Sequence, residues 1–108
     1  METSWEIINS LIQSLNSLSK VPPEQAILGQ ALKLCEEAGE VAEAVIGMLG
    51  MNPRKGLSHN VDDVRAEACD AAVTALILIA RTGADPRAVF EKHLQHLAGR
   101  SLTGEART

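Results

Sequence analysis

Residues 66–80 read AEACDAAVTALILIA, and this stretch decides the fold. Its polar side chains are Glu67, Asp70 and Thr74. Because successive helical residues turn by 100°, these spacings place all three on one narrow stripe of a helix. The other positions are apolar and are expected to be buried. Two carboxylates on a buried helix cost free energy unless they are paired or bound to a metal ion.

The helix-capping and helix-breaking residues of the sequence predict four helices and no strand. Thr3-Ser4-Trp5-Glu6 reads as a capping box, and Val21-Pro22-Pro23 ends the first helix. The second helix is predicted from Pro23 or Glu24 to about Leu49, the third from about Asp62 to Thr82, and the fourth from Asp85-Pro86 to Ala98 or Gly99. The fold class is therefore all-α, with one helical domain over residues 1–100 and a flexible tail over residues 101–108.

Composition excludes several classes of partner. The 108 residues include 14 acidic and 10 basic side chains, so the formal net charge is −4. This balance, with one Trp, one Phe and no Tyr, argues against a binder of nucleic-acid polymers. Neither a secretory signal nor a membrane-spanning stretch is found, so we expect no membrane partner and a cytoplasmic location. Cys35 and Cys69 are expected to be small buried hydrophobic residues.

The second helix carries a complementary set of acids, in the segment CEEAGEVAE at residues 35–43. Glu37 lies at the edge of the apolar stripe and Glu40 about 60° further round, so both are expected to face the two acids of the third helix. Four carboxylates without a nearby cation repel, by about 4 kcal/mol per pair at 4 Å and an effective dielectric of 20. A divalent cation relieves this repulsion, and oxygen ligands suit Mg²⁺ or Mn²⁺. The alternative is that Glu36, Glu37, Glu40 and Glu43 form a solvated acidic face.

Two motifs in these helices resemble the signature of a known enzyme family. The pattern Glu36-Glu37-x-x-Glu40 followed by Glu67-x-x-Asp70 resembles the EExxE…ExxD signature of the all-α nucleoside triphosphate pyrophosphohydrolases, the MazG-like family. The resemblance covers roughly residues 27–100. Residues 45–56 further resemble a short, single-domain bacterial subgroup.

This resemblance implies a fold, an activity and a set of roles. The fold would be a four-helix, all-α NTP pyrophosphatase-like bundle completed by oligomerisation. The activity would be hydrolysis of (deoxy)nucleoside triphosphates to the monophosphate and pyrophosphate, in the service of nucleotide-pool sanitising. Mg²⁺, or alternatively Mn²⁺, would be held by Glu37, Glu40, Glu67 and Asp70. The catalytic residues would be Glu36, Glu37 and Glu40, with Glu36 orienting or deprotonating the attacking water.

Four residues are candidates for substrate binding. Arg54 and Lys55 lie in a glycine-flanked loop and, with Lys92, could hold the phosphate tail; a plain surface position is the alternative for each. Members of the family often have a Lys followed four residues later by Asn in the last helix. Here Lys92 matches and His96 replaces the Asn.

Other residues have structural interpretations. Trp5 is expected to pack in the core, Thr74 to hydrogen-bond Asp70 or its own helix, and His59 to be a solvated loop residue. Since one short chain has too few helices to cover residues 71–80, we expect a homodimer or homotetramer.

Two alternatives to this function stay open. The chain could be a catalytically inactive helical interaction or regulatory module, a reading motivated by His96 and by the few aromatic residues. It could instead be a related pyrophosphatase acting on dUTP or phosphoribosyl-ATP, for which the same residues would serve.

Overall fold

The computed structural model describes residues 1–100, and the predicted tail lies outside them. The helices are α1 (Ser4–Leu18), α2 (Pro23–Leu49), α3 (Val61–Arg81) and α4 (Pro86–Ala98). No strand is present in this part of the chain, so the all-α prediction is confirmed for it. No helix in the described range combines the length and the apolar character needed to cross a bilayer.

Side-chain caps set most of the helix boundaries. The Glu6 N–H donates to Thr3 Oγ1 at 3.1 Å and the Thr3 N–H donates to the Glu6 carboxylate, which confirms the predicted capping box. A second capping box, of Asn60 and Asp63, was not predicted and begins α3 at Val61. The Asp85 side chain accepts from the Arg87 N–H, as the predicted start of α4 requires. The first helix ends at Leu18, earlier than the proline pair alone suggests.

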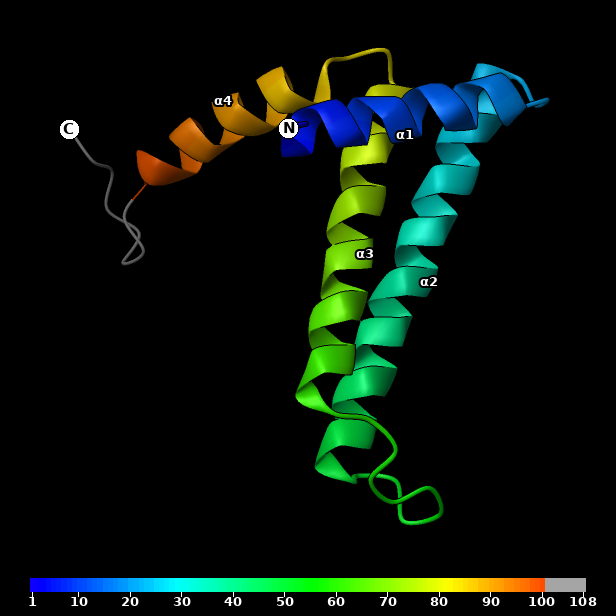
Figure 1. The fold of residues 1–108 in the computed structure, drawn as a ribbon, viewed down its shortest axis with the longest axis vertical. Coiled ribbons are helices and arrows are strands. Elements are labelled where there is room, and N and C mark those ends of the chain that lie inside the picture. The colour runs from blue at the N-terminus through cyan, green and yellow to red at the C-terminus, as the bar shows by residue number, and fades with distance from the viewer. Residues whose placement is uncertain (101–108) are drawn as a thin grey trace.

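The helices form a long antiparallel hairpin with a crossbar at one end. Figure 1 shows α2 and α3 side by side along the hairpin, with α1 and α4 lying across its upper end. The crossbar is joined by the rings of Trp5 and Phe90, whose centroids are 6.2 Å apart, and Arg81 Nη1 donates to Asn16 Oδ1 at 2.9 Å. The radius of gyration is 17.3 Å, whereas a compact domain of this length has about 13 Å. One chain is therefore an open arrangement and not a closed four-helix bundle.

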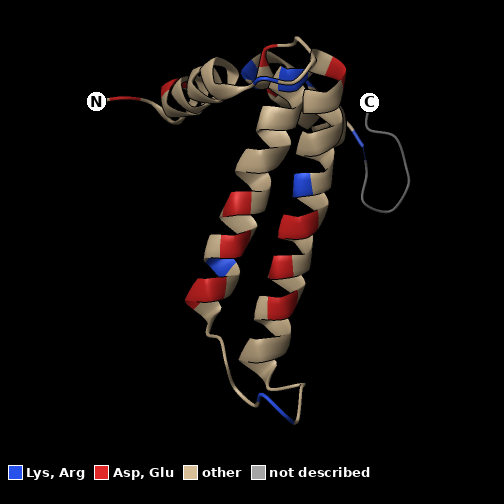
Figure 2. Ribbon diagram, turned by 90° about the vertical axis from the view of Figure 1, so that its right-hand side faces the viewer, with Lys and Arg blue, Asp and Glu red and all other residues tan. Residues whose placement is uncertain are grey.

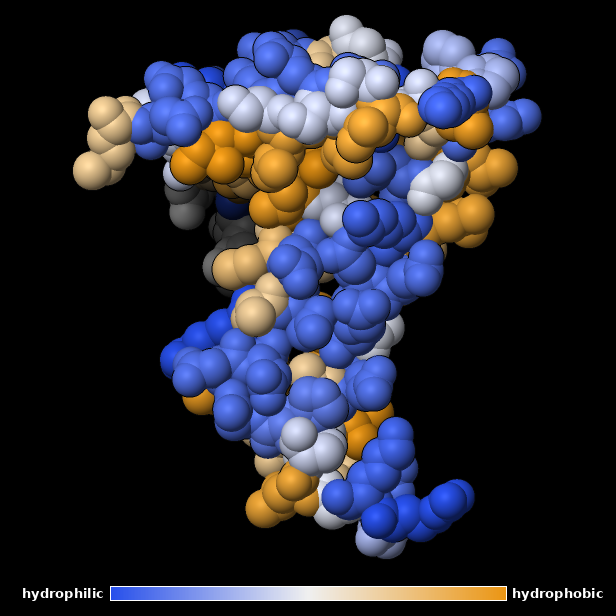
Figure 3. Space-filling model, turned by 45° about the vertical axis from the view of Figure 1, so that its right-hand side comes forward, coloured by the Kyte–Doolittle hydropathy of each residue, from blue (hydrophilic) through white to orange (hydrophobic). Residues whose placement is uncertain are grey.

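Very little apolar surface is buried within the chain. In the described range the buried apolar side chains of the core are those of Ala44 and Ile77, and Gly47 and Pro86 are buried as well. The prediction that nearly all of residues 71–80 would be buried is wrong for a single chain, because α3 packs along one side of α2 and most of its apolar residues are only half-buried. Figure 3 shows apolar side chains gathered beneath the crossbar.

The two cysteines also contradict the prediction made for them. Cys35 and Cys69 are both free and exposed. On α2 the buried positions that face α3 recur every seven residues, at Gln30, Glu37 and Ala44. Cys35 is two residues from Glu37 and therefore about 160° away around the helix. Cys35 therefore lies outside the face of α2 that packs against α3.

We predict that Gly47→Ala destabilises the hairpin whereas Gly29→Ala does not. A Cβ on Gly47 would lie 2.1 Å from His59 Nδ1 and 2.5 Å from Ser58 Oγ, so these two side chains would have to move and their 2.9 Å contact with each other would be disturbed. Overpacking of this kind costs about 1–3 kcal/mol. A Cβ on Gly29 meets no atom within 4 Å, and alanine there gains up to about 1 kcal/mol of helix propensity. Urea unfolding of the two variants should give shifts of opposite sign; a stabilised Gly47→Ala would contradict the packing described here.

Candidate functional site

A groove runs between the crossbar and the upper half of the hairpin. It has a volume of about 660 Å³. Its wall is formed by Leu11, Ser14 and Leu15 of α1, Lys33, Glu37 and Glu40 of α2, and Asp70, Val73, Thr74 and Ile77 of α3. Figure 2 shows the acidic residues of the two long helices at corresponding heights. Three of the four predicted metal ligands thus share one cavity, with apolar side chains at its other wall.

Glu37 is the anchored member of this set. It is buried, with 7% of its surface exposed, and Thr74 Oγ1 donates a short hydrogen bond to Glu37 Oε1. Gln30 Nε2 in turn donates to the Thr74 backbone carbonyl at 3.2 Å. The prediction that Thr74 would bond Asp70 or its own helix is therefore wrong, since its hydroxyl crosses to α2. The place of Gln30 was missed, although a polar residue seven positions before Glu37 on a packing face was a usable signal.

Glu67 is the acidic residue whose surroundings disfavour its ionised form. Its pKa is raised above its ordinary value of 4.5, first by a hydrogen bond with Glu40, then by desolvation, and then by the charges of Glu40, Asp70 and Glu37. Two carboxyl groups share a hydrogen bond only when one of them is protonated. In the described part of the chain, Glu67 Oε2 is buried and has no hydrogen-bond partner. Such an atom calls for either a proton or a cation.

The chemistry of this donor set fits a hard divalent cation. The four carboxyl groups supply only oxygen ligands, which Mg²⁺ and Mn²⁺ prefer. Within residues 1–100, no three or more acidic, His or Cys side chains are already arranged to hold a metal ion. Glu40 and Asp70 are exposed, so their side chains are free to change rotamer on binding.

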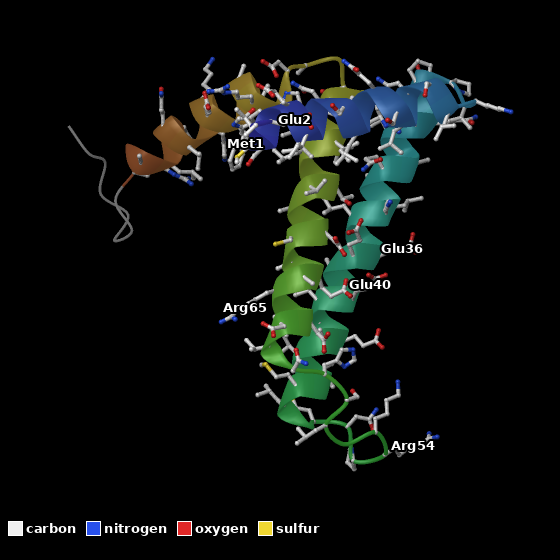
Figure 4. All side chains as sticks on the ribbon, viewed as in Figure 1. Met1, Glu2, Glu36, Glu40, Arg54 and Arg65 are labelled. Atoms are coloured by element: carbon white, nitrogen blue, oxygen red, sulfur yellow. The ribbon has the colours of Figure 1, made fainter. Side chains whose placement is uncertain are left out.

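The predicted substrate-binding residues do not line the groove within one chain. Arg54 lies at the far tip of the hairpin loop, away from Glu36 and Glu40 in the middle of α2 (Figure 4). Lys55 lines a smaller pocket of about 260 Å³ beside that loop. Lys92 and His96 are exposed on α4, which leaves the end of α3 beyond the groove. Loop length and helix direction decide these positions, and neither can be read from local spacing.

Glu36 and Lys33, two neighbours of Glu37 on α2, differ in whether they line the groove. Glu36 is exposed and does not line the groove, because its side chain lies about 100° around α2 from Glu37. Lys33 does line it, although the sequence analysis did not single it out. Its spacing of four residues before Glu37 places the two on one face of the helix and was the signal that could have found it.

Comparisons with protein-family models, with curated proteins and with solved structures found no match for this chain. The site is therefore interpreted from its own chemistry and from the motif resemblance in α2 and α3. Of the predicted metal ligands, Glu37, Glu40 and Asp70 share the groove, and each of these three raises the pKa of Glu67.

We predict that Thr74→Val destabilises the protein by about 1–3 kcal/mol, because the buried Glu37 carboxylate loses its donor. Thr74→Ser retains the hydroxyl and removes only a methyl group, so it should keep most of the stability. Chemical denaturation of the two variants measures the difference. Equal losses for valine and serine would show that the hydroxyl contributes nothing and that only packing matters.

Proposed function

We propose that this protein is a Mg²⁺-dependent nucleoside triphosphate pyrophosphohydrolase of the MazG-like type, which cleaves between the α and β phosphates. The observation that carries the proposal is the groove in which Glu37, Glu40 and Asp70 converge beside Glu67. Converging carboxylates with a buried, unpaired oxygen are poorly explained as a solvated surface. An apolar wall next to a charged end suits a ligand that is itself apolar at one end and anionic at the other.

The apolar residues and the lysine of the groove wall have separate roles in this proposal. Leu11 and Leu15 of α1, with Val73 and Ile77 of α3, offer an apolar surface to the base. Lys33 is the cation in the groove wall and would bind a phosphate oxygen. This role replaces, within one chain, the one predicted for Arg54 and Lys55.

The acidic end supplies the chemistry. Glu37, Glu40, Glu67 and Asp70 would hold Mg²⁺, which when bound neutralises phosphate oxygens and lowers the pKa of a coordinated water. Thr74 and Gln30 hold the Glu37 carboxylate in place through their hydrogen bonds. The role that the motif resemblance implies for Glu36, to orient or deprotonate the attacking water, would require its side chain to turn toward the groove, because it is exposed and lies outside the groove wall.

We also propose that the working form is a homo-oligomer, a dimer or a tetramer. The support is the small number of buried apolar residues and the many large apolar side chains left exposed on α1, α2 and α4. A chain of this size with so little buried core gains stability by covering apolar surface against another copy.

The activity is tested by incubating the protein with a panel of (deoxy)nucleoside triphosphates and Mg²⁺ and separating the products by ion-exchange chromatography. We expect monophosphate and pyrophosphate in equal amounts, and no orthophosphate from the enzyme itself. The panel should include dUTP and phosphoribosyl-ATP, because a preference for either would assign the protein to a related pyrophosphatase. No cleavage of any nucleotide would contradict the proposal.

Calorimetry with Mg²⁺ and a nonhydrolysable triphosphate separates an enzyme with an untested substrate from an inactive interaction module. The enzyme binds both, whereas the module should bind neither. Absence of both heats, together with an inactive panel, would favour the interaction module.

A further inference from the structure

A second cavity, separate from the groove, lies where three helix ends meet. Its volume is about 310 Å³, and none of its lining residues also lines the groove. The C-terminal end of α1 and the first turn of α2 form it together with the last turn of α3 (Figure 1). Three polar side chains belong to its wall, those of Asn16, Ser19 and Arg81, and the wall is otherwise apolar or glycine. No acidic residue of the described range lines this cavity.

Arg81 is the charged residue of this wall, and its guanidinium is only partly paired. The side chain is half-buried, and Arg81 Nη1 donates to Asn16 Oδ1 at 2.9 Å. Arg81 Nε is buried and has no hydrogen-bond partner within residues 1–100. Neither of the two ion pairs found in this range includes Arg81. A guanidinium stays ionised in proteins, so a half-buried one without a counter-charge costs free energy that an anion would relieve.

The position of Arg81 in the last turn of α3 does not by itself satisfy its guanidinium. The helix dipole favours a cation there, because the last carbonyl groups of a helix are negative. This effect acts on the charge as a whole and provides no acceptor for Nε. The next acidic residue along the chain, Asp85, lines a neighbouring pocket and accepts from the Arg87 N–H at 3.3 Å. Arg81 is therefore a cation that lines a cavity without a carboxylate partner in the described chain.

The polar groups that share the wall with Arg81 can act as donors, which favours an oxyanion as the ligand. Since Asn16 Oδ1 accepts from Arg81, the NH₂ group of the same amide is left to donate elsewhere. The Ser19 hydroxyl lies in the same wall and can also donate. A carboxylate has two oxygens, which a guanidinium alone can occupy. A phosphate group has further oxygens for the amide and the hydroxyl.

The beginning of α2 adds an electrostatic field of the same sign. This helix starts at Pro23, which belongs to the wall, and no side chain caps its N-terminus. The first N–H groups of a helix lack intrahelical partners, and the positive end of the helix dipole favours an anion. This field acts on the same cavity as the unpartnered Arg81 Nε, so two independent features favour negative charge there.

We propose that this cavity binds a phosphate group, either inorganic phosphate or the end of a small phosphomonoester. Arg81 supplies the charge and two parallel N–H donors, and Asn16 and Ser19 supply further donors. Because Arg81 Nε is covered in the unliganded chain, the end of this side chain turns toward the cavity on binding. The apolar wall at Val21 and Ala26 is available to the organic part of an ester. The inference does not rest on the proposed activity, since the cavity and the groove share no residue.

Calorimetric titration of the full chain with inorganic phosphate, in EDTA and at constant ionic strength, tests the assignment. EDTA removes metal ions that could hold phosphate in the groove. The wild type should give a saturable heat, and Arg81→Gln should weaken the affinity at least tenfold because charge-assisted hydrogen bonds are lost. Arg65→Gln is the matched control, since Arg65 is an exposed arginine of the same helix and should leave the affinity unchanged. Phenyl phosphate should bind more tightly than inorganic phosphate if the natural ligand is an ester, and no more tightly if it is the free anion.

A second pair of variants keeps the test independent of the bond between Arg81 and Asn16. Ser19→Asp places a carboxylate in the wall beside Arg81, whereas Ser17→Asp places one on an exposed residue at the same end of α1. In phosphate-free buffer Ser19→Asp should have the higher melting temperature of the two, and it alone should abolish the phosphate heat. A wild type without a saturable heat at millimolar phosphate overturns the proposal. A heat that survives Ser19→Asp, or that Lys33→Gln removes and Arg81→Gln leaves unchanged, overturns it as well, and the second result places the phosphate in the groove.

Discussion

Glu40→Gln should lower kcat/KM for nucleotide cleavage by at least about a hundredfold while leaving the fold intact. Glu40 lines the groove and is the first cause of the raised pKa of Glu67, so it is the residue that links Glu67 to the groove. Loss of residues that only support a metal ligand already costs 10–100-fold, and loss of a ligand should cost more. The measurement is pyrophosphate release at saturating Mg²⁺, with circular dichroism to verify the helices.

Glu43→Gln is the matched control for this variant. It is the same substitution on the same helix, one turn further on, at an exposed residue that lines the pocket beside the loop and not the groove. Its activity should equal that of the wild type. If both variants, or neither, lost activity, the acidic face of α2 would act through its overall charge and the assignment of Glu40 would be wrong.

Mg²⁺ should stabilise the wild-type protein, and Glu67→Gln should remove most of this effect. A ligand that binds only the folded state at about a hundred times its dissociation constant adds about 2.7 kcal/mol. In the metal-free protein the pKa of Glu67 is raised by its hydrogen bond with Glu40, by desolvation and then by the charges of Glu40, Asp70 and Glu37, and a bound cation would offset these charges. Thermal unfolding with EDTA and with Mg²⁺, for the wild type and for Glu67→Gln, measures the difference.

The raised pKa of Glu67 also predicts a pH dependence with a definite sign. Above pH 4.5 the folded state keeps a proton on Glu67 that the unfolded state has released, so this group makes stability fall as pH rises. The decline continues until the pH has passed the folded-state pKa. Glutamine cannot ionise, and its amide can still donate to Glu40. Relative to the wild type, the metal-free Glu67→Gln variant should therefore gain stability with increasing pH.

Urea titrations in EDTA between pH 4.5 and 7.5 measure this difference, with Glu43→Gln as the reference for a loss of charge alone. A wild type and a Glu67→Gln variant whose stabilities stay parallel over this range would show that Glu67 ionises normally and that the four carboxylates do not interact.

The helices themselves were predictable because their signals are local. The capping box at Thr3 and the Asp85-Pro86 start depend on residues within one turn of each other, and both are present. The box at Asn60 was equally local and was overlooked. The exposure of individual side chains could not be obtained in this way, since Cys35 and Cys69 were expected to be buried and both are exposed.

The candidate site was predictable in part for the same reason. The spacing of Glu67 and Asp70 in an apolar helix indicated two acids that need partners, and the structure places both beside acids of α2. The cations were not predictable. Lys33 lines a groove that exists only because α1 forms its opposite wall. Lys92 lies outside this groove, on α4.

By itself, the sequence determined the all-α class, most helix ends and a pair of acidic motifs on α2 and α3, because caps and helical periodicity act within a few residues. Only the tertiary structure decided that one chain is an open hairpin with a crossbar, that Thr74 bonds Glu37, and that Glu67 Oε2 is buried without a partner. These features depend on the packing register of two helices, which is set by contacts between residues more than 25 positions apart.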